Sequence, residues 1–195
     1  MRKAILSFAA IAALASVVLI ACADSTASEK KKGIAMTQQE MVDRGSYLVN
    51  AMGCDDCHSP KKMTATGVEI IPELRLSGFN PEMASLKPAT DAIKQGWMLF
   101  GTDLTTAVGQ WGQSYAANLT SDATGIGNWK EEQFIKAIRE GKYKGLDNTR
   151  PLLPPMPWFV YKNLSDDDLK SIFAFLKTTK PVKNAVPGPK PFDKL

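Results

Sequence analysis

Apolar residues repeat with helical spacing at two places that lie far apart in the chain. The first stripe runs through Met41, Leu48 and Val49, directly after a T-Q-Q-E capping-box pattern at 37–40. Gly45 falls on the same stripe, and a glycine inside a helix costs stability unless it serves the close approach of another helix. The pattern therefore predicts an N-terminal helix that a second helix crosses near Gly45.

The second stripe lies near the C-terminus. It comprises Leu169, Ile172 and Phe173, and it follows Ser165 and three consecutive aspartates, which suit the N-terminus of a helix. The sequence thus predicts a helix near each end of the domain.

The region between these helices is less regular. A third helix is predicted over 129–140, with Asn128 as its N-cap and Gly141 as its terminator. Glycine and proline interrupt 59–127, which we interpret as mostly loop with a short helical segment over 90–100 and a brief strand over 68–71. A loop of this length usually has a function of its own or wraps a cofactor.

The first 21 residues have the form of a secretory signal, because an almost wholly apolar run follows Arg2 and Lys3. The run ends in L-I-A-C, which resembles a bacterial lipoprotein box and implies cleavage before Cys22 and acylation of that cysteine. An uncleaved membrane-spanning helix and an ordinary signal peptide are the alternatives. Residues 22–36 are predicted to be a flexible tether between the lipid and the domain.

Charge excludes one class of partner. The chain has 24 lysines and arginines against 20 acidic residues, a formal net charge of +4. A nucleic-acid partner calls for a strongly basic face, so we expect none. The Pro- and Lys-rich tail, 183–195, is predicted to be extended, either packed along the surface or mobile.

The candidate chemistry is concentrated in C-D-D-C-H at 54–58, a C-x-x-C-H motif of the kind that attaches a c-type haem. Two thiols at this spacing can bond to the two vinyl groups of one porphyrin, and the imidazole that follows then ligates the iron. His58 is the only histidine of the chain. The motif predicts one covalent haem c, bound by Cys54 and Cys57 with His58 as the proximal iron ligand.

Two other interpretations of the motif are weaker. A redox-active C-x-x-C pair normally follows a buried strand in a βαβ unit, whereas this pair follows a helical pattern. A zinc site needs about four protein ligands, and the motif supplies three. With Cys22 assigned to lipid and the other cysteines to haem, we expect no disulfide.

A second axial ligand has to be sought among the methionines, because the chain has no other histidine. Met83, Met98 and Met156 are the candidates far enough from the motif to reach the opposite haem face. Prolines stiffen the segment L-L-P-P-M-P-W around Met156, so we predict Met156 as the sixth ligand. A methionine that fills a gap in the core is the alternative.

Together these features resemble a class I cytochrome c, in which an N-terminal helix, C-x-x-C-H, a methionine loop and a C-terminal helix follow one another. The segments N-L-T-S-D at 118–122, G-I-G-N-W at 125–129 and M-P-W at 156–158 are similar to one branch of that family. The branch includes cytochrome subunits of periplasmic dehydrogenases.

The resemblance implies an all-α domain over 37–182, whose first and last helices cross near Gly45 and Phe173 and enclose a single haem. Residues 60–115 are then a long loop-rich insertion that shields a haem edge. Arg150, Trp158 and Tyr161 are candidates to bind a haem propionate, with ordinary core or surface roles as the alternative. Lys61 and Lys62 are either solvated or part of a docking face for an acidic partner.

In function, the resemblance implies a one-electron carrier and not an enzyme in its own right. We expect an exported protein, lipid-anchored to a bacterial membrane and facing the periplasm or the cell exterior. Its redox partners are expected to be a dehydrogenase, an oxidase or another cytochrome. The alternatives are a subunit of a dehydrogenase or oxidase complex, and a haem sensor or peroxidase-like protein with an open iron site.

Overall fold

A computed structural model describes residues 36–82 and 87–195, which belong to one compact unit, Met36–Leu195. The predicted signal segment, the lipid-bearing Cys22, Met83 and all of the predicted tether except Met36 lie outside the described residues. None of the described helices is both long and apolar enough to cross a membrane.

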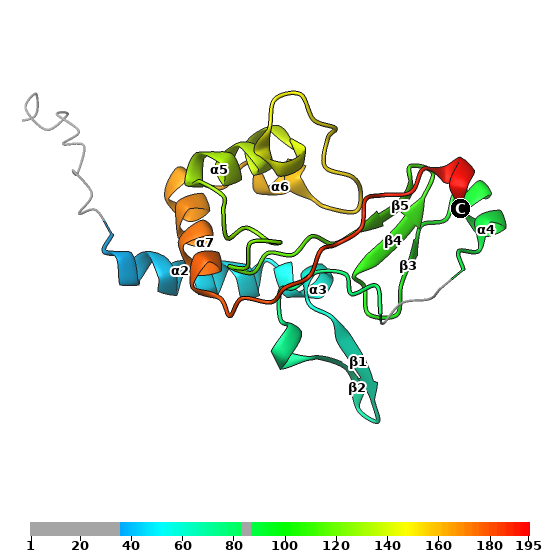
Figure 1. Ribbon diagram of the computed structural model, residues 1–195, viewed down its shortest axis with the longest axis horizontal. Coiled ribbons are helices and arrows are strands. Elements are labelled where there is room, and N and C mark those ends of the chain that lie inside the picture. Colours follow the sequence, from blue (N-terminus) through cyan, green and yellow to red (C-terminus); the bar gives the residue numbers. More distant parts are fainter. Residues whose placement is uncertain (1–35, 83–86) are drawn as a thin grey trace, which may run out of the picture. The chain divides into compact units, whose positions relative to one another are not determined.

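Helices α2 and α7 form the centre of the fold (Figure 1). Helix α2 spans Gln38–Ala51, and its capping box is confirmed, because Thr37 and Glu40 each accept a hydrogen bond from the other's backbone N–H. Helix α7 spans Asp166–Thr178, and the Ser165 side chain caps it by accepting from the Asp168 N–H. Both terminal helices are therefore where the apolar stripes predict them.

The two helices cross at Gly45, as predicted, but the contact is with Ser171 and Phe175 and not with Phe173. A Cβ atom at Gly45 would lie 1.9 Å from the Ser171 carbonyl oxygen and 2.8 Å from the Phe175 Cβ. The absence of a side chain at Gly45 is what lets the two backbones come this close.

Helix α5, Glu131–Glu140, packs on α7 and on the short helix α6, Trp158–Tyr161. Its start differs from the prediction, since Lys130 and not Asn128 occupies the N-cap position and no side chain caps the helix. Gly141 ends it in the left-handed conformation, as predicted. The buried apolar cluster that joins these helices, here called the core cluster, comprises Val49, Leu76, Ile126, Phe134, Ile138, Leu169, Ile172, Phe173 and Leu176.

The prediction of an all-α fold is wrong, because two small antiparallel sheets occupy the region between Lys61 and Tyr115. The strands are β1 Lys61–Thr64, β2 Gly67–Ile70, β3 Leu99–Phe100, β4 Thr106–Gly109 and β5 Gly112–Tyr115. Strands β1 and β2 pair with each other, and β4 lies between β3 and β5. None exceeds four residues, which is too short for a two-residue hydrophobic period to stand out from loop sequence.

Short helical turns complete the described chain. The stretch predicted as helical over 90–100 is a helix only in its first half and continues into β3. The remaining elements are α3 Cys54–His58, η2 Pro72–Leu74, α4 Thr90–Lys94, η3 Tyr143–Gly145 and η4 Phe192–Lys194.

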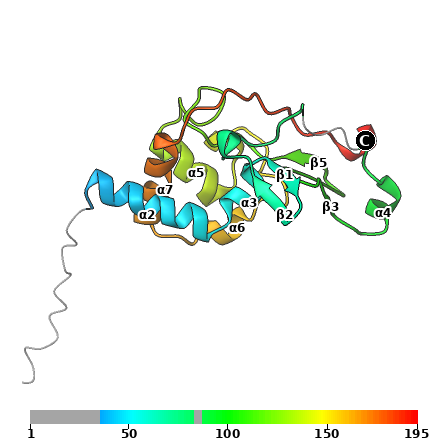
Figure 2. The same cartoon turned by 90° about the horizontal axis from the view of Figure 1, so that it is seen from below.

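The C-terminal tail runs extended along the domain from the end of α7 to β5 (Figures 1 and 2). The Asn184 amide donates to the carbonyl oxygens of Ser77 and Phe79, at 2.8 and 2.9 Å. Further along, Gln113 of β5 and Lys190 exchange two backbone hydrogen bonds of 2.7 and 3.0 Å. The tail therefore covers backbone groups that would otherwise be left unpaired.

The Gly45 crossing generates a stability prediction. Gly45→Ala should lower the free energy of unfolding by about 3 kcal/mol, because the new Cβ forces α2 away from the backbone of α7. Chemical denaturation followed by circular dichroism measures this loss.

Gly188→Ala is the matched control, since nothing lies within 4 Å of a Cβ placed there. It should change stability by less than about 0.5 kcal/mol. Equal stability of the two variants would contradict the helix crossing described here.

Candidate functional site

The two candidate haem cysteines lie on one short helix. Helix α3 covers Cys54–His58 and follows Gly53, whose left-handed conformation ends α2 and turns the chain. Cys54 and Cys57 are separated by one helical turn, so their side chains lie on the same face. Both thiols are free and half-buried.

The imidazole of His58 is held by a backbone carbonyl. Its Nδ1 lies 2.8 Å from the Ala117 oxygen. A carbonyl oxygen can only accept, so Nδ1 carries the proton and Nε2 keeps its lone pair. A neutral imidazole anchored through one nitrogen is the arrangement in which the other nitrogen ligates a metal.

The carbonyl that holds His58 is itself held in place. The backbone over 76–79 runs beside 116–119, with Phe79 donating to the Ala116 oxygen at 2.9 Å and Leu119 donating to the Leu76 oxygen at 2.8 Å. Gly78 also donates to the His58 carbonyl, at 2.8 Å.

Only glycine fits at position 78. Its φ is +78°, and a Cβ there would lie 2.5 Å from the Ala116 oxygen. Gly78 thus allows the close backbone approach that fixes both the ring and the backbone of His58.

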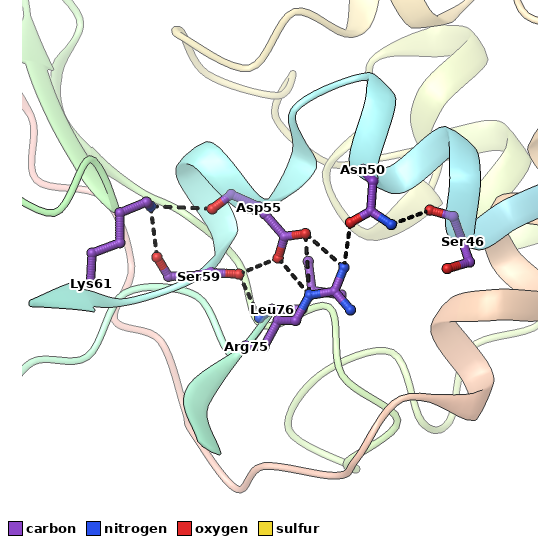
Figure 3. Close-up of polar contacts among 7 residues, drawn as sticks. All are labelled: Ser46, Asn50, Asp55, Ser59, Lys61, Arg75 and Leu76. Carbon is purple, nitrogen blue, oxygen red and sulfur yellow. Dashed lines mark hydrogen bonds and ion pairs between the residues drawn. The ribbon is translucent and has the colours of Figure 1, made fainter. Parts of the chain in front are cut away.

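A partly buried ion pair fixes the middle of the motif (Figure 3). Asp55 is 8% exposed, and its carboxylate accepts from Arg75 Nε at 3.0 Å and from Arg75 Nη2 at 2.7 Å. The Ser59 hydroxyl donates to the same carboxylate at 2.6 Å and accepts from the Leu76 N–H at 2.8 Å. Arg75 reaches back to the Asn50 side chain of α2, at 2.9 Å. Helix α3 is therefore bound to α2 and to the segment after β2.

Lys61 binds the C-terminal end of the same helix. Its ammonium donates to the carbonyl oxygens of Asp56, Ser59 and Asp103, at 2.7, 2.8 and 3.1 Å, and approaches that of Asp55 at 3.2 Å. A side chain engaged in this way is neither simply solvated nor presented for docking. The neighbour Lys62 is exposed, so both alternatives, solvation and docking, stay open for it.

The methionine loop is anchored on both sides of its proline run. Leu152 donates to the Gly141 oxygen at 2.7 Å, and the Ser114 hydroxyl of β5 donates to the Pro154 oxygen at 2.6 Å. Met156 is half-buried and packs against the core cluster, as Cys54 also does. Met98, by contrast, is 44% exposed beside β3. Met156 as an iron ligand stays a prediction.

The residues suggested for the haem propionates have protein partners of their own. The Tyr161 hydroxyl donates to the Met52 carbonyl at 2.9 Å. The Arg150 guanidinium stacks on the Tyr143 ring at 4.0 Å and donates to the Pro151 carbonyl. Trp158 packs directly beneath Gly141. Their role toward a propionate remains a prediction.

The thiols themselves do not have the character of a redox-active pair. Burial, together with the neighbouring Asp55 carboxylate, raises the pKa of Cys54 to about 11, and burial also raises the pKa of Cys57. Redox-active C-x-x-C pairs work through a thiol whose pKa is lowered. Across 36–82 and 87–195, no group of three or more His, Cys, Asp or Glu side chains is placed to hold a metal ion.

The donor set instead fits a covalent haem. Two free thiols project from one helical turn, and the adjoining imidazole presents an unprotonated nitrogen. That combination provides two thioether positions and one axial ligand. Cys54, Cys57 and His58 are the residues that would hold the group.

Comparison with known proteins points to the same chemistry. The chain is 29% identical over 181 residues to the fructose dehydrogenase cytochrome subunit of Gluconobacter japonicus, covering 91% of this chain and 29% of that protein. It is 31% identical over 147 residues to the gluconate 2-dehydrogenase cytochrome c subunit of Pantoea cypripedii, covering 74% and 25%. No protein-family model matches the chain.

The chain is similar to cytochrome c subunits of dehydrogenases. The cytochrome c subunit of the quinone alcohol dehydrogenase of Gluconobacter oxydans is 40% identical over 73 residues, covering 36% of this chain and 15% of that subunit. These similarities support a cytochrome c-type protein with haem c as its cofactor. The chain spans less than a third of the length of each of these relatives.

The sequence predicts the C-x-x-C-H motif as the haem site but does not reveal the residues that fix the motif in the fold. Ala117, Gly78 and Arg75 lie far from the motif in sequence, and no local pattern marks them. The one available signal was Asp55 itself, since a carboxylate inside a motif that packs onto a core needs a partner. The partner's identity depends on the tertiary fold.

The Asp55–Arg75 pair predicts a loss of stability on truncation. Asp55→Ala should lower the free energy of unfolding by about 2–3 kcal/mol, because it removes the charged partner of Arg75 and the acceptor for the proton of the Ser59 hydroxyl. Denaturant titration of the haem-loaded protein gives the value.

Asp91→Ala provides the comparison, because Asp91 pairs with Lys94 in full exposure to solvent. Its loss should change stability by less than about 0.5 kcal/mol. If Asp55→Ala changed the free energy of unfolding as little as Asp91→Ala does, the ion pair could not be what fixes helix α3.

Proposed function

We propose that this chain is a monohaem c-type cytochrome that transfers single electrons as the cytochrome partner or subunit of a dehydrogenase. The observation that carries the proposal is the geometry of His58, whose ring is anchored through Nδ1 to Ala117 beside two free thiols on the same helical turn. Similarity to cytochrome c subunits of dehydrogenases supports the same function.

The chain's own residues fix and tune the cofactor. A bound haem supplies a one-electron ferric–ferrous couple, and the protein supplies orientation, burial and axial ligation. Cys54 and Cys57 would anchor the porphyrin, and His58 would ligate one face of the iron. Met156 is proposed for the other face, where a thioether ligand favours the ferrous state.

The partner is proposed from the relatives. Three of them carry names that join a cytochrome subunit to a dehydrogenase acting on fructose, gluconate or an alcohol. In the same arrangement, this chain would accept electrons from a dehydrogenase and pass them to an oxidase or another cytochrome. The single C-x-x-C-H motif of the printed sequence supports one haem for this chain.

Membrane attachment is part of the same proposal. The apolar segment that ends at Cys22 supports export and lipid anchoring of that cysteine, with the protein facing the periplasm or the cell exterior. A lipid anchor would keep the carrier close to membrane-bound partners, which raises the effective concentration at which they meet.

Met156→Ala tests the ligand assignment. The oxidised wild-type protein should show the weak far-red band of a sulfur–iron bond, and the variant should lose it and have a lower reduction potential. Absorption spectroscopy of the full chain, expressed in a host that matures c-type cytochromes, measures both.

Met63→Ala is the control, because Met63 is 70% exposed on β1 and its truncation should leave the band in place. Retention of the band in Met156→Ala would rule out Met156 as the ligand. Absence of the band from the wild type would favour an open iron site and a sensor or peroxidase-like function.

A further inference from the structure

One charged group beside the haem-binding motif is left without a counter-ion. Lys61 follows His58 by three residues and begins β1. Its ammonium donates to carbonyl oxygens of the α3 end and to that of Asp103, and Figure 3 shows its bonds toward Asp55 and Ser59. All of these acceptors are neutral backbone groups.

Two of the neighbouring carboxylates are engaged elsewhere. Asp55 pairs with Arg75, and the Asp103 carboxylate accepts from the Thr105 N–H and hydroxyl. Among the described residues, no carboxylate oxygen lies within the 4.0 Å of an ion pair with Lys61. Asp103 and Asp56 are the carboxylates whose negative charges act most strongly on the ammonium.

The two cations next to the motif therefore differ in their electrostatic effect. Arg75 and Asp55 form a pair whose charges largely cancel at a distance. Lys61 contributes a net positive charge, and it is half-buried, so water and salt screen it less than a surface lysine.

We propose that Lys61 raises the reduction potential of the haem held by Cys54, Cys57 and His58. Reduction adds one electron and no proton to the ferric iron, which lowers the charge of the haem by one unit. A fixed ammonium beside the attachment helix stabilises the less positive ferrous product relative to the ferric form. This inference rests on the proposed function.

The long insertion helps to hold the Lys61 ammonium in place. Asp103 lies in the turn between β3 and β4, where Leu104 adopts a positive φ of 64° and donates to the Gly101 oxygen at 2.9 Å. That turn directs the Asp103 carbonyl at the ammonium. The sheet β3–β4–β5 is thereby linked to the haem-binding helix through Lys61.

The experiment is a redox titration of the full haem-loaded chain, with a mediator mixture, comparing Lys61→Gln with Lys62→Gln. Both variants lose one positive charge, but Lys62 is exposed. Lys61→Gln should shift the ferric–ferrous equilibrium about tenfold toward ferric, about 59 mV for a one-electron couple. Lys62→Gln should shift it less, and in 1 M salt only the Lys61→Gln shift should persist.

Two further variants separate charge from structure. Lys61→Arg keeps the charge and should keep the potential, whereas a purely structural role predicts that it shifts as far as Lys61→Gln. Asp103→Asn keeps an acceptor for Thr105 while removing a negative charge near Lys61, and it should raise the potential. This variant keeps the inference testable should Lys61→Gln fail to fold.

Three results would overturn the inference: equal shifts for Lys61→Gln and Lys62→Gln, a Lys61→Arg shift as large as that of Lys61→Gln, or an unchanged potential in Asp103→Asn. A wild-type protein that shows no ferric–ferrous transition in the titration is a different outcome. It would contradict the proposed function itself.

Discussion

The site depends on one hydrogen bond, from the imidazole of His58 to the carbonyl of Ala117. A C-x-x-C-H motif on a short helix has little rigidity of its own, because a five-residue helix has too few internal bonds to hold a side chain still. The Ala117 bond fixes the tautomer of His58 and the plane of its ring. Everything that positions Ala117, including the close approach at Gly78, therefore acts on the proposed iron ligand.

The structure gives the insertion between the motif and β5 a role that the sequence did not predict. From the sequence we expected residues 60–115 to shield a haem edge. The structure shows the insertion bonded to the motif at three points, through Lys61, Arg75 and Gly78. Its last strand also reaches the methionine loop through Ser114. One inserted region thus contacts both His58 and the loop of Met156, the two proposed iron ligands.

Short sequence patterns predicted those parts of the structure that depend on only a few neighbouring residues. The T-Q-Q-E box, Ser165 with its aspartates, and Gly141 marked helix ends correctly, because capping is settled within a few residues. The brief strand predicted over 68–71 corresponds to β2, but β1 and the sheet β3–β4–β5 were missed because their strands are too short to show a period. Ala117 and Arg75 were missed because their roles arise only where distant segments meet. The C-x-x-C-H motif could be recognised in the sequence because the haem attachment that it predicts requires three residues at fixed spacing.

The proposed function requires that a porphyrin is bonded to Cys54 and Cys57. Intact-mass measurement of the protein, produced in a host that matures c-type cytochromes, detects that bond directly. We expect a coloured protein whose mass exceeds that of the processed polypeptide and any lipid by one haem, and whose haem stays with the chain on denaturation. A colourless product with the mass of polypeptide and lipid alone would contradict it.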